Sequence, residues 1–219
     1  KCVVLPPDFE KFQINMEALK EAVNEHTKGI IVNSPNNPTG AILSEDSIRK
    51  LSAFLSEKEA EFGHPIFLIG DEPYRELVYD GSEVPYLTNY YDDTIICYSF
   101  SKSLSLPGER IGYILVSDRI RDCTDLYAAV CGAGRALGYV CAPSLLQKTV
   151  AENLGISSDL TTYKTNRDLL YRALTEYGYE CLYPDGAFYL SVKSPVEDEK
   201  EFVVKAKEHR ILFVSGGGF

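Results

Sequence analysis

Thr94-Ile95-Ile96-Cys97-Tyr98-Ser99-Phe100-Ser101-Lys102 is a short apolar run that leads directly into a lysine-bearing polar loop. The β-branched and aromatic residues at its start predict a strand buried in a sheet. The polar loop continues to Arg110, and a second strand-like run follows at 113–116. Because ligands bind beyond the carboxyl ends of strands in open α/β sheets, this loop is a candidate binding segment.

The same alternation of short apolar runs and helical patterns extends toward the N-terminus and beyond residue 116. We expect strands at 3–5, 29–33, 66–69, 94–98 and 113–116, and helices at 15–24, 47–61, 120–131 and 143–154. The runs at 29–33 and 66–69 are continuous enough to predict strands buried on both faces. This βαβ alternation predicts an α/β domain over residues 1–155, with a mostly parallel sheet and flanking helices.

The pattern changes after Gly155. We expect a long amphipathic helix at 159–177, a strand pair at 179–183 and 188–192, a helix at 199–208 and a last strand at 211–214. This order predicts part of a small α+β domain over residues 156–219. The chain lacks an initiator Met and stops on Gly216-Gly217-Gly218-Phe219, so we expect it to be a piece of a longer protein.

Composition narrows the classes of function. The chain has 219 residues, 45% of them hydrophobic, and a formal net charge of −10. Such a chain can bury a core, and its acidity argues against binding nucleic acid or an anionic membrane. The six cysteines lack C-x-x-C spacing and the three histidines stand apart from them, which disfavours a zinc site or a His-based nucleophile. Reduced thiols in a cytoplasmic protein are the simpler interpretation.

Polar residues cluster after three of the predicted strands, at 33–40, 70–74 and 99–110. Taken singly, each has an ordinary interpretation as a turn, a helix cap or a solvated loop. Together they bring an amide, a carboxylate, a phenol, hydroxyls, one amine and one guanidinium to the same sheet edge. An amine can form a Schiff base with an aldehyde, a carboxylate can hold a pyridine nitrogen protonated, and hydroxyls with an arginine can bind a phosphate. These groups indicate pyridoxal 5′-phosphate (PLP).

The chain resembles the class I/II aminotransferases of the aspartate aminotransferase superfamily, which are PLP-dependent enzymes of fold type I. The resemblance is carried by N-N-P-T-G (36–40), D-E-P-Y (71–74) and S-F-S-K-S-L-S-L-P-G-E-R-I-G-Y (99–113), with weaker support from N-R-D-L-L (166–170) and P-D-G-A-F-Y (184–189). It implies transfer of an amino group between an L-amino acid and a 2-oxo acid, and a homodimer in the full-length enzyme.

The resemblance also implies roles for individual residues. Lys102 forms the Schiff base and moves the proton during transfer, and Asp71 pairs with the pyridinium nitrogen. Tyr74 and Asn37 hydrogen-bond the 3′ oxygen of the cofactor, and Asn37 also helps to hold the substrate carboxylate. We further expect the cationic partner of Asp71 to lower the pKa of its carboxyl.

The phosphate-binding residues implied by the resemblance are Ser99, Ser101 and Arg110. Phe188 falls where the family places an aromatic side chain near the substrate, although a core position on a strand explains it equally well. The glycine-rich segment 132–138 has G-x-G-x-x-x-G spacing without the strand that a dinucleotide loop needs, and we expect a flexible loop near the cofactor pocket.

Two alternatives stay open. A PLP-dependent β-lyase or decarboxylase of the same fold would use the same lysine, aspartate, tyrosine and arginine. A folded but inactive module is the other alternative, because the family's ring-stacking aromatic, its glycine- and serine-rich phosphate loop and its carboxylate-binding arginine fall outside this sequence. On that ground we expect the isolated chain to bind PLP weakly and to transaminate poorly.

Overall fold

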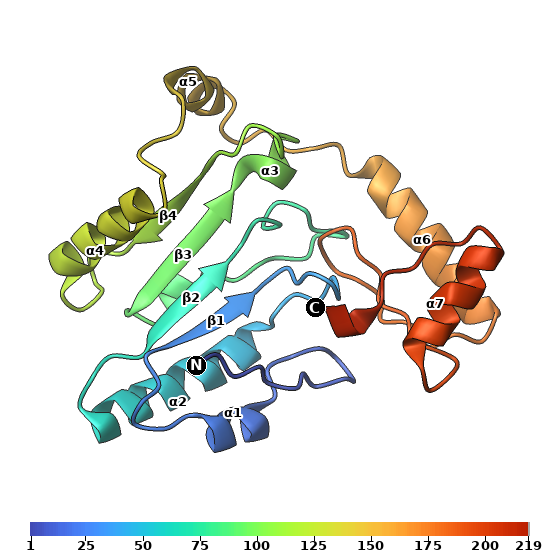
Figure 1. The fold of residues 1–219 in the computed structure, drawn as a ribbon, viewed down its shortest axis with the longest axis horizontal. Helices are drawn as coiled ribbons and strands as arrows, with labels where there is room; N and C mark the ends of the chain where they lie inside the picture. Colours follow the sequence, from blue (N-terminus) through green and yellow to red (C-terminus); the bar gives the residue numbers. More distant parts are fainter. Residues whose placement is uncertain (219) are drawn as a thin grey trace.

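The central sheet has four strands in the order β1-β2-β3-β4 (Figure 1). The computed structural model describes residues 1–218, so Phe219, which belongs to the predicted small-domain portion, lies outside the described residues. The strands are β1 (Gly29–Asn33), β2 (Phe67–Asp71), β3 (Thr94–Ser99) and β4 (Gly112–Val116). Strands β1, β2 and β3 run parallel and β4 runs antiparallel to β3, which confirms the predicted mostly parallel sheet with flanking helices.

The strand register places the predicted polar clusters side by side. Asn33 at the end of β1 is opposite Asp71 at the end of β2, and Asp71 is opposite Cys97 in β3. The short helix α3 (Phe100–Ser103) follows β3 directly. Three polar segments therefore leave the sheet at the same edge, as parallel pairing requires.

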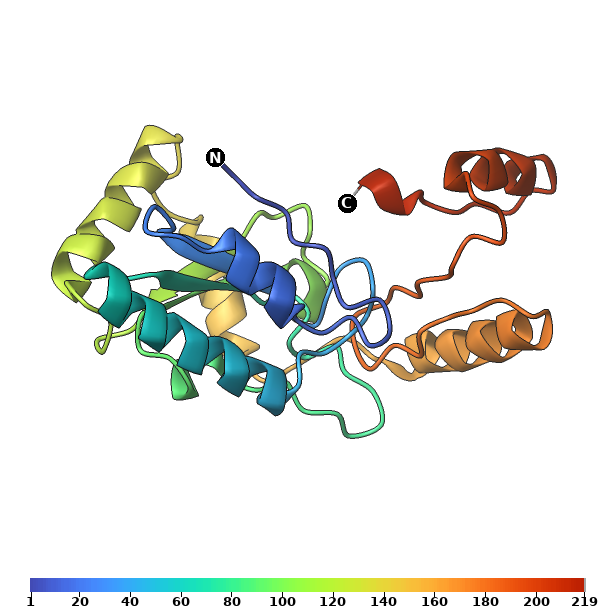
Figure 2. The same ribbon diagram turned by 90° about the horizontal axis from the view of Figure 1, so that it is seen from below.

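Helices α1 (Met16–Ala22) and α2 (Glu45–Phe62) lie side by side against the sheet and close the main core (Figures 1 and 2). The Ser44 side chain caps α2 by accepting from the Ser47 backbone N–H, and Gly63 ends it in the left-handed region. Leu51 and Leu55 of α2 are fully buried against Leu68 of β2. Each such side chain contributes about 2 kcal/mol to stability through burial.

The remaining helices follow the sheet in the chain. They are α4 (Cys123–Ala136), α5 (Ser144–Glu152), α6 (Thr161–Glu176) and α7 (Glu199–Glu208), with single 3₁₀ turns at Leu87–Asn89 and Gly216–Gly218. Helix α4 contacts β4, and none of its described residues is buried. Helices α6 and α7 lie apart from the sheet, on the side toward which β1, β2 and β3 point (Figures 1 and 2). No helix within residues 1–218 combines the length and the apolar character that a bilayer crossing needs.

A buried arginine fastens α6 to the loop after β2. The side chain of Arg167 is only 4% exposed, and its Nη2 lies 2.6 Å from an Asp80 carboxylate oxygen. Its Nη1 donates to the Pro184 carbonyl oxygen at 3.1 Å. The guanidinium lies between the rings of Tyr79 and Tyr183, 4.4 and 4.3 Å from their centroids. One side chain thus joins three segments of the chain.

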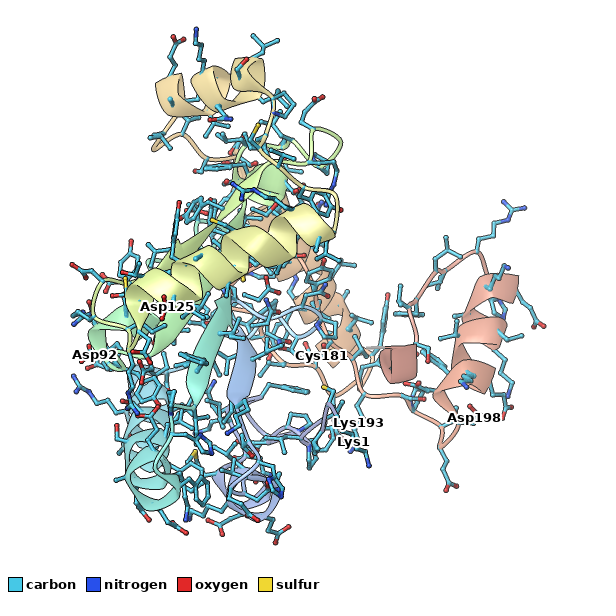
Figure 3. All side chains as sticks on the ribbon, turned by 60° about the vertical axis from the view of Figure 1, so that its left-hand side comes forward. Lys1, Asp92, Asp125, Cys181, Lys193 and Asp198 are labelled. Carbon is cyan, nitrogen blue, oxygen red and sulfur yellow. The ribbon has the colours of Figure 1, made fainter. Side chains whose placement is uncertain are left out.

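Several predicted strands are not formed. Residues 3–5 and 211–214 are irregular, because a strand needs a partner and nothing in the described chain pairs with either run. The predicted pair 179–183 and 188–192 is reduced to one antiparallel bridge, Cys181 to Val192. Cys181 and Lys193 accordingly lie close together where these two extended segments meet (Figure 3).

Two further expectations were wrong: the burial of the first strand on both faces and the flexible loop at 132–138. Strand β1 is not buried on both faces: Ile30 and Val32 face the core that α1 and α2 cover, whereas Ile31 on the opposite face is 70% exposed. The glycine-rich segment 132–138 is not a flexible loop: helix α4 continues to Ala136 and ends where Gly138 adopts a φ of +90°. The alanines and the arginine around these glycines favour a helix, which outweighs the cost of about 1 kcal/mol per glycine.

Candidate active site

The side chain of Asn33 connects two of the predicted motifs. Its Nδ2 donates to the backbone oxygen of Asp71 at 2.8 Å and to a carboxylate oxygen of the same residue at 3.2 Å. Its Oδ1 accepts from the backbone N–H of Asn37 at 2.7 Å. The carboxylate at the end of β2 and the turn after β1 are therefore held by one amide.

The N-N-P-T-G segment is a turn stabilised from within. Asn36 Oδ1 accepts from both the backbone N–H and the hydroxyl of Thr39, at 3.1 and 2.8 Å. Gly40 closes the turn with its N–H on the Asn36 carbonyl at 2.9 Å and a φ of +72°, a conformation that glycine adopts without strain. The segment is the tight turn that its composition predicts.

The same turn packs against the distant P-D-G-A-F-Y segment. The Gly40 carbonyl accepts from the backbone N–H groups of Asp185 and Gly186 at 3.1 and 2.9 Å. The Ser191 hydroxyl donates to the Pro38 carbonyl at 3.0 Å. The two motifs that carry the family resemblance at 36–40 and 184–189 thus form one unit in space.

Asn37 presents a polar atom that the described residues leave without a partner. Its Oδ1 is buried and accepts no hydrogen bond within residues 1–218. An unsatisfied buried acceptor costs about 1–3 kcal/mol, so a water molecule or a ligand group that donates to this atom would be stabilised there. Because Asn33 links the backbone of Asn37 to the Asp71 carboxylate, the Asn37 amide is suited to binding a ligand at this edge.

Asp71 ends β2, and desolvation decides the direction in which its pKa moves. Although part of its surface is exposed, the neighbouring backbone and side chains desolvate the carboxyl and raise its pKa above the ordinary value. The lowered pKa that we expect belongs to the carboxyl paired with a pyridinium nitrogen, and no lysine or arginine within the described chain takes the place of that cation in an ion pair. Without a nearby positive charge, desolvation decides the direction of the shift.

Tyr74 lies three residues after Asp71 and is buried, with 4% of its surface exposed. Its hydroxyl is 2.7 Å from the hydroxyl of Tyr189. Burial, followed by the hydrogen bond with Tyr189, raises the pKa of Tyr74 well above that of a free tyrosine. The phenol is therefore neutral across the physiological pH range and able to donate a hydrogen bond.

Lys102 lies on α3, where its Nζ faces two aromatic rings. The ring centroids of Tyr74 and Phe188 are 5.6 and 5.1 Å from this nitrogen. Phe188 in turn stacks on Tyr163, with centroids 5.6 Å apart and planes 24° from parallel. The Ser158 hydroxyl donates to the Lys102 carbonyl at 2.9 Å, which ties α3 to the start of the α6 region. The structure thus brings the predicted amine and the predicted phenol together.

The predicted phosphate-binding residues lie at the end of β3 and on the β3–β4 connection. The Ser99 hydroxyl donates to the Ser101 hydroxyl at 2.7 Å, and the Ser101 N–H donates to Ser99 Oγ at 3.1 Å. Arg110 is exposed, and its Nη1 donates to the Pro107 carbonyl at 2.8 Å. Within residues 1–218 no hydrogen bond joins its guanidinium to either serine. The two serines are brought together, whereas Arg110 is only nearby in the chain.

The first residue of β4, Gly112, has to be a glycine. Ser99 and Gly112 are register partners, and a Cβ atom on Gly112 would overlap the Tyr98 carbonyl oxygen. Only a glycine lets β4 approach β3 this closely at the point where the chain enters the site.

Two residues that we did not single out from the sequence are central to these contacts. Asn33 lies in the first polar cluster, but its amide connects two strand ends only through their register. Tyr189 lies next to Phe188, the residue that we considered, and its hydroxyl is the group that reaches Tyr74. Two sequence features could have identified them: Asn33 is a polar residue directly at a strand end, and Tyr189 is the second aromatic residue of P-D-G-A-F-Y.

The mixed α/β sheet, with an amine, a phenol, a carboxylate and an amide at the ends of its parallel strands, has the arrangement of an enzyme site at a sheet edge. The chain belongs to the family described as aminotransferase class I and II, whose model matches residues 2–219. The resemblance inferred from the motifs is thereby confirmed.

Individual relatives agree with the family. The chain is 30% identical to a probable aspartate aminotransferase of Methanocaldococcus jannaschii, over 96% of this chain and 55% of that protein. An aminotransferase of Eubacterium rectale, known from its crystal structure, is 59% identical with a TM-score of 0.96, covering 98% of this chain and 54% of its own. The aspartate aminotransferase of Thermotoga maritima superposes with a TM-score of 0.85 at 25% identity, over 99% and 56% of the two chains. The chain spans about half the length of the relatives that it matches.

Proposed function

We propose that this chain is the cofactor-binding portion of a PLP-dependent aminotransferase, which transfers an amino group between an L-amino acid and a 2-oxo acid. The observation that carries the proposal is the distance of 5.6 Å between Lys102 Nζ and the ring centroid of Tyr74, in a chain that the aminotransferase family model matches. Tyr74 itself lies three residues after Asp71, the last residue of β2. An amine, a neutral phenol and a carboxylate at one sheet edge are the groups that a pyridoxal ring requires.

The residues present fit the cofactor. The buried Asn37 Oδ1 lacks a partner in the described chain, and the assignment of oxygen and nitrogen in an amide can be exchanged by a flip, so either end can meet a ring substituent. Tyr74 would donate to the ring oxygen, and Asp71 would pair with the ring nitrogen. When bound, PLP supplies an electron sink that stabilises negative charge on the substrate carbon.

Lys102 would act as both the anchoring amine and the proton carrier. Its Nζ would hold the cofactor by condensing with its aldehyde, with loss of water, and, when freed by the substrate amine, this nitrogen would be the base placed to take and return a proton. The rings of Tyr74 and Phe188 hold this nitrogen at the sheet edge.

Asp71 gives the proposal an electrostatic basis. Its pKa is raised by desolvation in this structure, so a cationic ring nitrogen at hydrogen-bond distance would stabilise the carboxylate and bring the pKa back down. The hydroxyls of Ser99 and Ser101 would donate hydrogen bonds to the phosphate. Arg110 would exchange its hydrogen bond with the Pro107 carbonyl for a charge-assisted hydrogen bond to a phosphate oxygen.

The assembly and surroundings are part of the same proposal. We propose a division into a large-domain portion over 1–155 and a small-domain portion over 156–219, supported by the separation of α6 and α7 from the sheet (Figure 2). A homodimer is proposed from the family alone. All six cysteines are free, which is consistent with the reducing cytoplasm.

The test is covalent capture of PLP on Lys102. We would incubate the purified chain with PLP, reduce it with borohydride and map the modified peptide by mass spectrometry. Because reduction is irreversible, it captures even a weakly formed adduct. We expect modification of the peptide that contains Lys102, its loss in Lys102→Ala, and no loss in Lys205→Ala, a control on the exposed face of α7. Random modification of surface lysines, with none at Lys102, would contradict the proposal.

The type of reaction is tested separately on the longer enzyme. Formation of a 2-oxo acid from an amino donor without release of ammonia would support transamination. Release of ammonia or carbon dioxide would instead support a lyase or a decarboxylase of the same fold.

A further inference from the structure

Asn33 uses both ends of its side-chain amide to join two segments that the proposed function places on one ligand. The Nδ2 group donates to the Asp71 backbone oxygen at 2.8 Å and to its carboxylate at 3.2 Å, and the Oδ1 atom accepts from the Asn37 N–H at 2.7 Å. A third contact, from Asn36 Nδ2 at 3.4 Å, reaches the same Oδ1.

This pattern of contacts can be made by an amide and by few other side chains. An amide carries two N–H donors and an acceptor oxygen, whereas a carboxylate only accepts and a hydroxyl is too short to reach both sides. An aspartate at this position would place a second negative charge beside the Asp71 carboxylate. A leucine of similar size would leave the Asn37 N–H without its acceptor.

The sheet itself does not depend on this side chain. The Asp71 carbonyl also accepts from the Ser34 N–H at 3.3 Å, and the β1–β2 ladder continues through the backbone of residues 29–33. The Asn33 side chain is therefore an addition to the strand pairing. Its contacts are aimed at the carboxylate of Asp71 and at the turn that carries Asn37.

We propose that Asn33 is a positioning residue, which orients the Asp71 carboxylate and the Asn37 turn relative to each other so that both meet the same pyridine ring. The inference rests on the proposed function for its ligand, and it adds a residue to which neither the motifs nor the family match assigns a role. Asn33 acts through its two partners and does not itself touch the reacting atoms.

The direct test measures the ionisation of Asp71 in the chain without added cofactor. Carbon-13 NMR of the aspartate carboxyl groups follows Asp71 as a function of pH, and Asp71→Asn identifies its resonance. Because a neutral donor stabilises the carboxylate, we expect Asn33→Leu to raise the pKa of Asp71 by about half a unit, and Asn33→Asp to raise it further. Asn153→Leu, at the end of α5, is the matched control and leaves the Asp71 titration unchanged.

A second measurement tests whether Asn33 affects the binding of PLP. We expect Asn33→Leu to reduce borohydride-captured PLP on Lys102 several-fold at subsaturating cofactor, with Asn153→Leu at the wild-type level. Asn33→Ser, which is smaller and retains a hydroxyl, gives a milder variant of the same series if the leucine variant does not fold, as judged by circular dichroism.

The outcomes separate the two proposals. A folded Asn33 variant with an unmoved Asp71 titration overturns the positioning role, even where Lys102 captures PLP normally. Failure of the wild-type chain to capture PLP on Lys102 overturns the cofactor proposal, whereas the shift of the Asp71 titration still reports the Asn33 contact. Loss of stability alone, with Asp71 and PLP capture unchanged, would show that Asn33 has a structural role only.

Discussion

The hydroxyl oxygens of Tyr74 and Tyr189 lie 2.7 Å apart, although 115 residues separate them in the chain. Tyr74 belongs to the segment after β2, and Tyr189 belongs to the chain that returns past the N-N-P-T-G turn. Either oxygen can donate in such a pair, and a hydrogen bond that raises the pKa of Tyr74 is one in which Tyr74 donates to Tyr189.

Removal of the Tyr189 hydroxyl tests this relationship. Tyr189→Phe removes the hydrogen bond, whereas the burial that chiefly raises the pKa of Tyr74 persists. We therefore expect the pKa of Tyr74 to fall by about half a unit to one unit and to stay above that of a free tyrosine. Carbon-13 NMR of the tyrosine Cζ atoms resolves the individual phenols. Tyr177→Phe, at a position that is 78% exposed, should leave Tyr74 unchanged, and an equal shift in both variants would exclude a specific pair.

Asp71 predicts a pH dependence of stability. Its pKa is higher in the folded chain than in the unfolded chain, so it favours folding most when protonated, below the ordinary value of 3.8. That contribution is lost as the pH rises through the folded pKa. Asp71→Asn keeps an acceptor for Asn33 and removes the charge. We expect the variant to gain stability relative to wild type at pH 7, and the gain to vanish near pH 3. Urea unfolding midpoints at the two pH values measure the difference, and a gain that is larger at pH 3 would contradict the assigned direction.

The buried Arg167 predicts a large effect of a single substitution. Arg167→Met removes the ion pair with Asp80, the bond to the Pro184 carbonyl and the contacts with two tyrosine rings. We expect a loss of about 2–3 kcal/mol in the free energy of unfolding, because a buried carbonyl loses its donor and the rings lose a cation. The control is Arg172→Met on the exposed face of the same helix, for which we expect a change within about 0.5 kcal/mol. Equal effects of the two substitutions would show that Arg167 is not the fastening residue.

Two glycines predict opposite effects of the same substitution. Gly112→Ala places a methyl group against the Tyr98 carbonyl and pushes β4 from β3, at a cost of about 1–3 kcal/mol. Gly132 lies inside helix α4, where an added methyl group meets no atom within 4 Å apart from its chain neighbours and the backbone of its own helix. The substitution Gly132→Ala also removes backbone freedom from the unfolded chain. We expect it to stabilise the chain by about 0.5–1 kcal/mol. Thermal unfolding of the pair measures both signs, and destabilisation by Gly132→Ala would contradict a helix at this position.

The parts of the molecule that local chemistry determines were predictable from the sequence. The strand before Lys102, the Ser44 cap of α2 and the polar residues at the strand ends all follow from neighbours in the chain. Which segments would pair with one another was not predictable in the same way. Residues 3–5 have strand composition and no strand, because pairing depends on a neighbour that composition does not specify. Residues 132–138 have loop-like glycines and a helix, because the residues between them outweigh the glycines.

The same distinction, between local motifs and long-range pairing, applies to the residues of the candidate site. Lys102 and Tyr74 were identified from their motifs, and the structure brings them together. Asn33 was missed, because its two contacts exist only when β1 and β2 are in register. Tyr189 was missed because the side chain that points at Tyr74 is decided by the path of an irregular segment, where the alternation of a strand gives no guide.

The hydrogen bonds from Asp185 and Gly186 to the Gly40 carbonyl also make the proposed ligand-binding edge depend on residues far away in the sequence. The outer side of the turn that carries Asn37 is completed by residues almost 150 positions further along the chain. Closing so long a loop costs conformational entropy, and contacts of this kind slow folding. A cut or a destabilising substitution near residue 185 would therefore reach the Asn37 turn, although neither lies at the sheet edge itself.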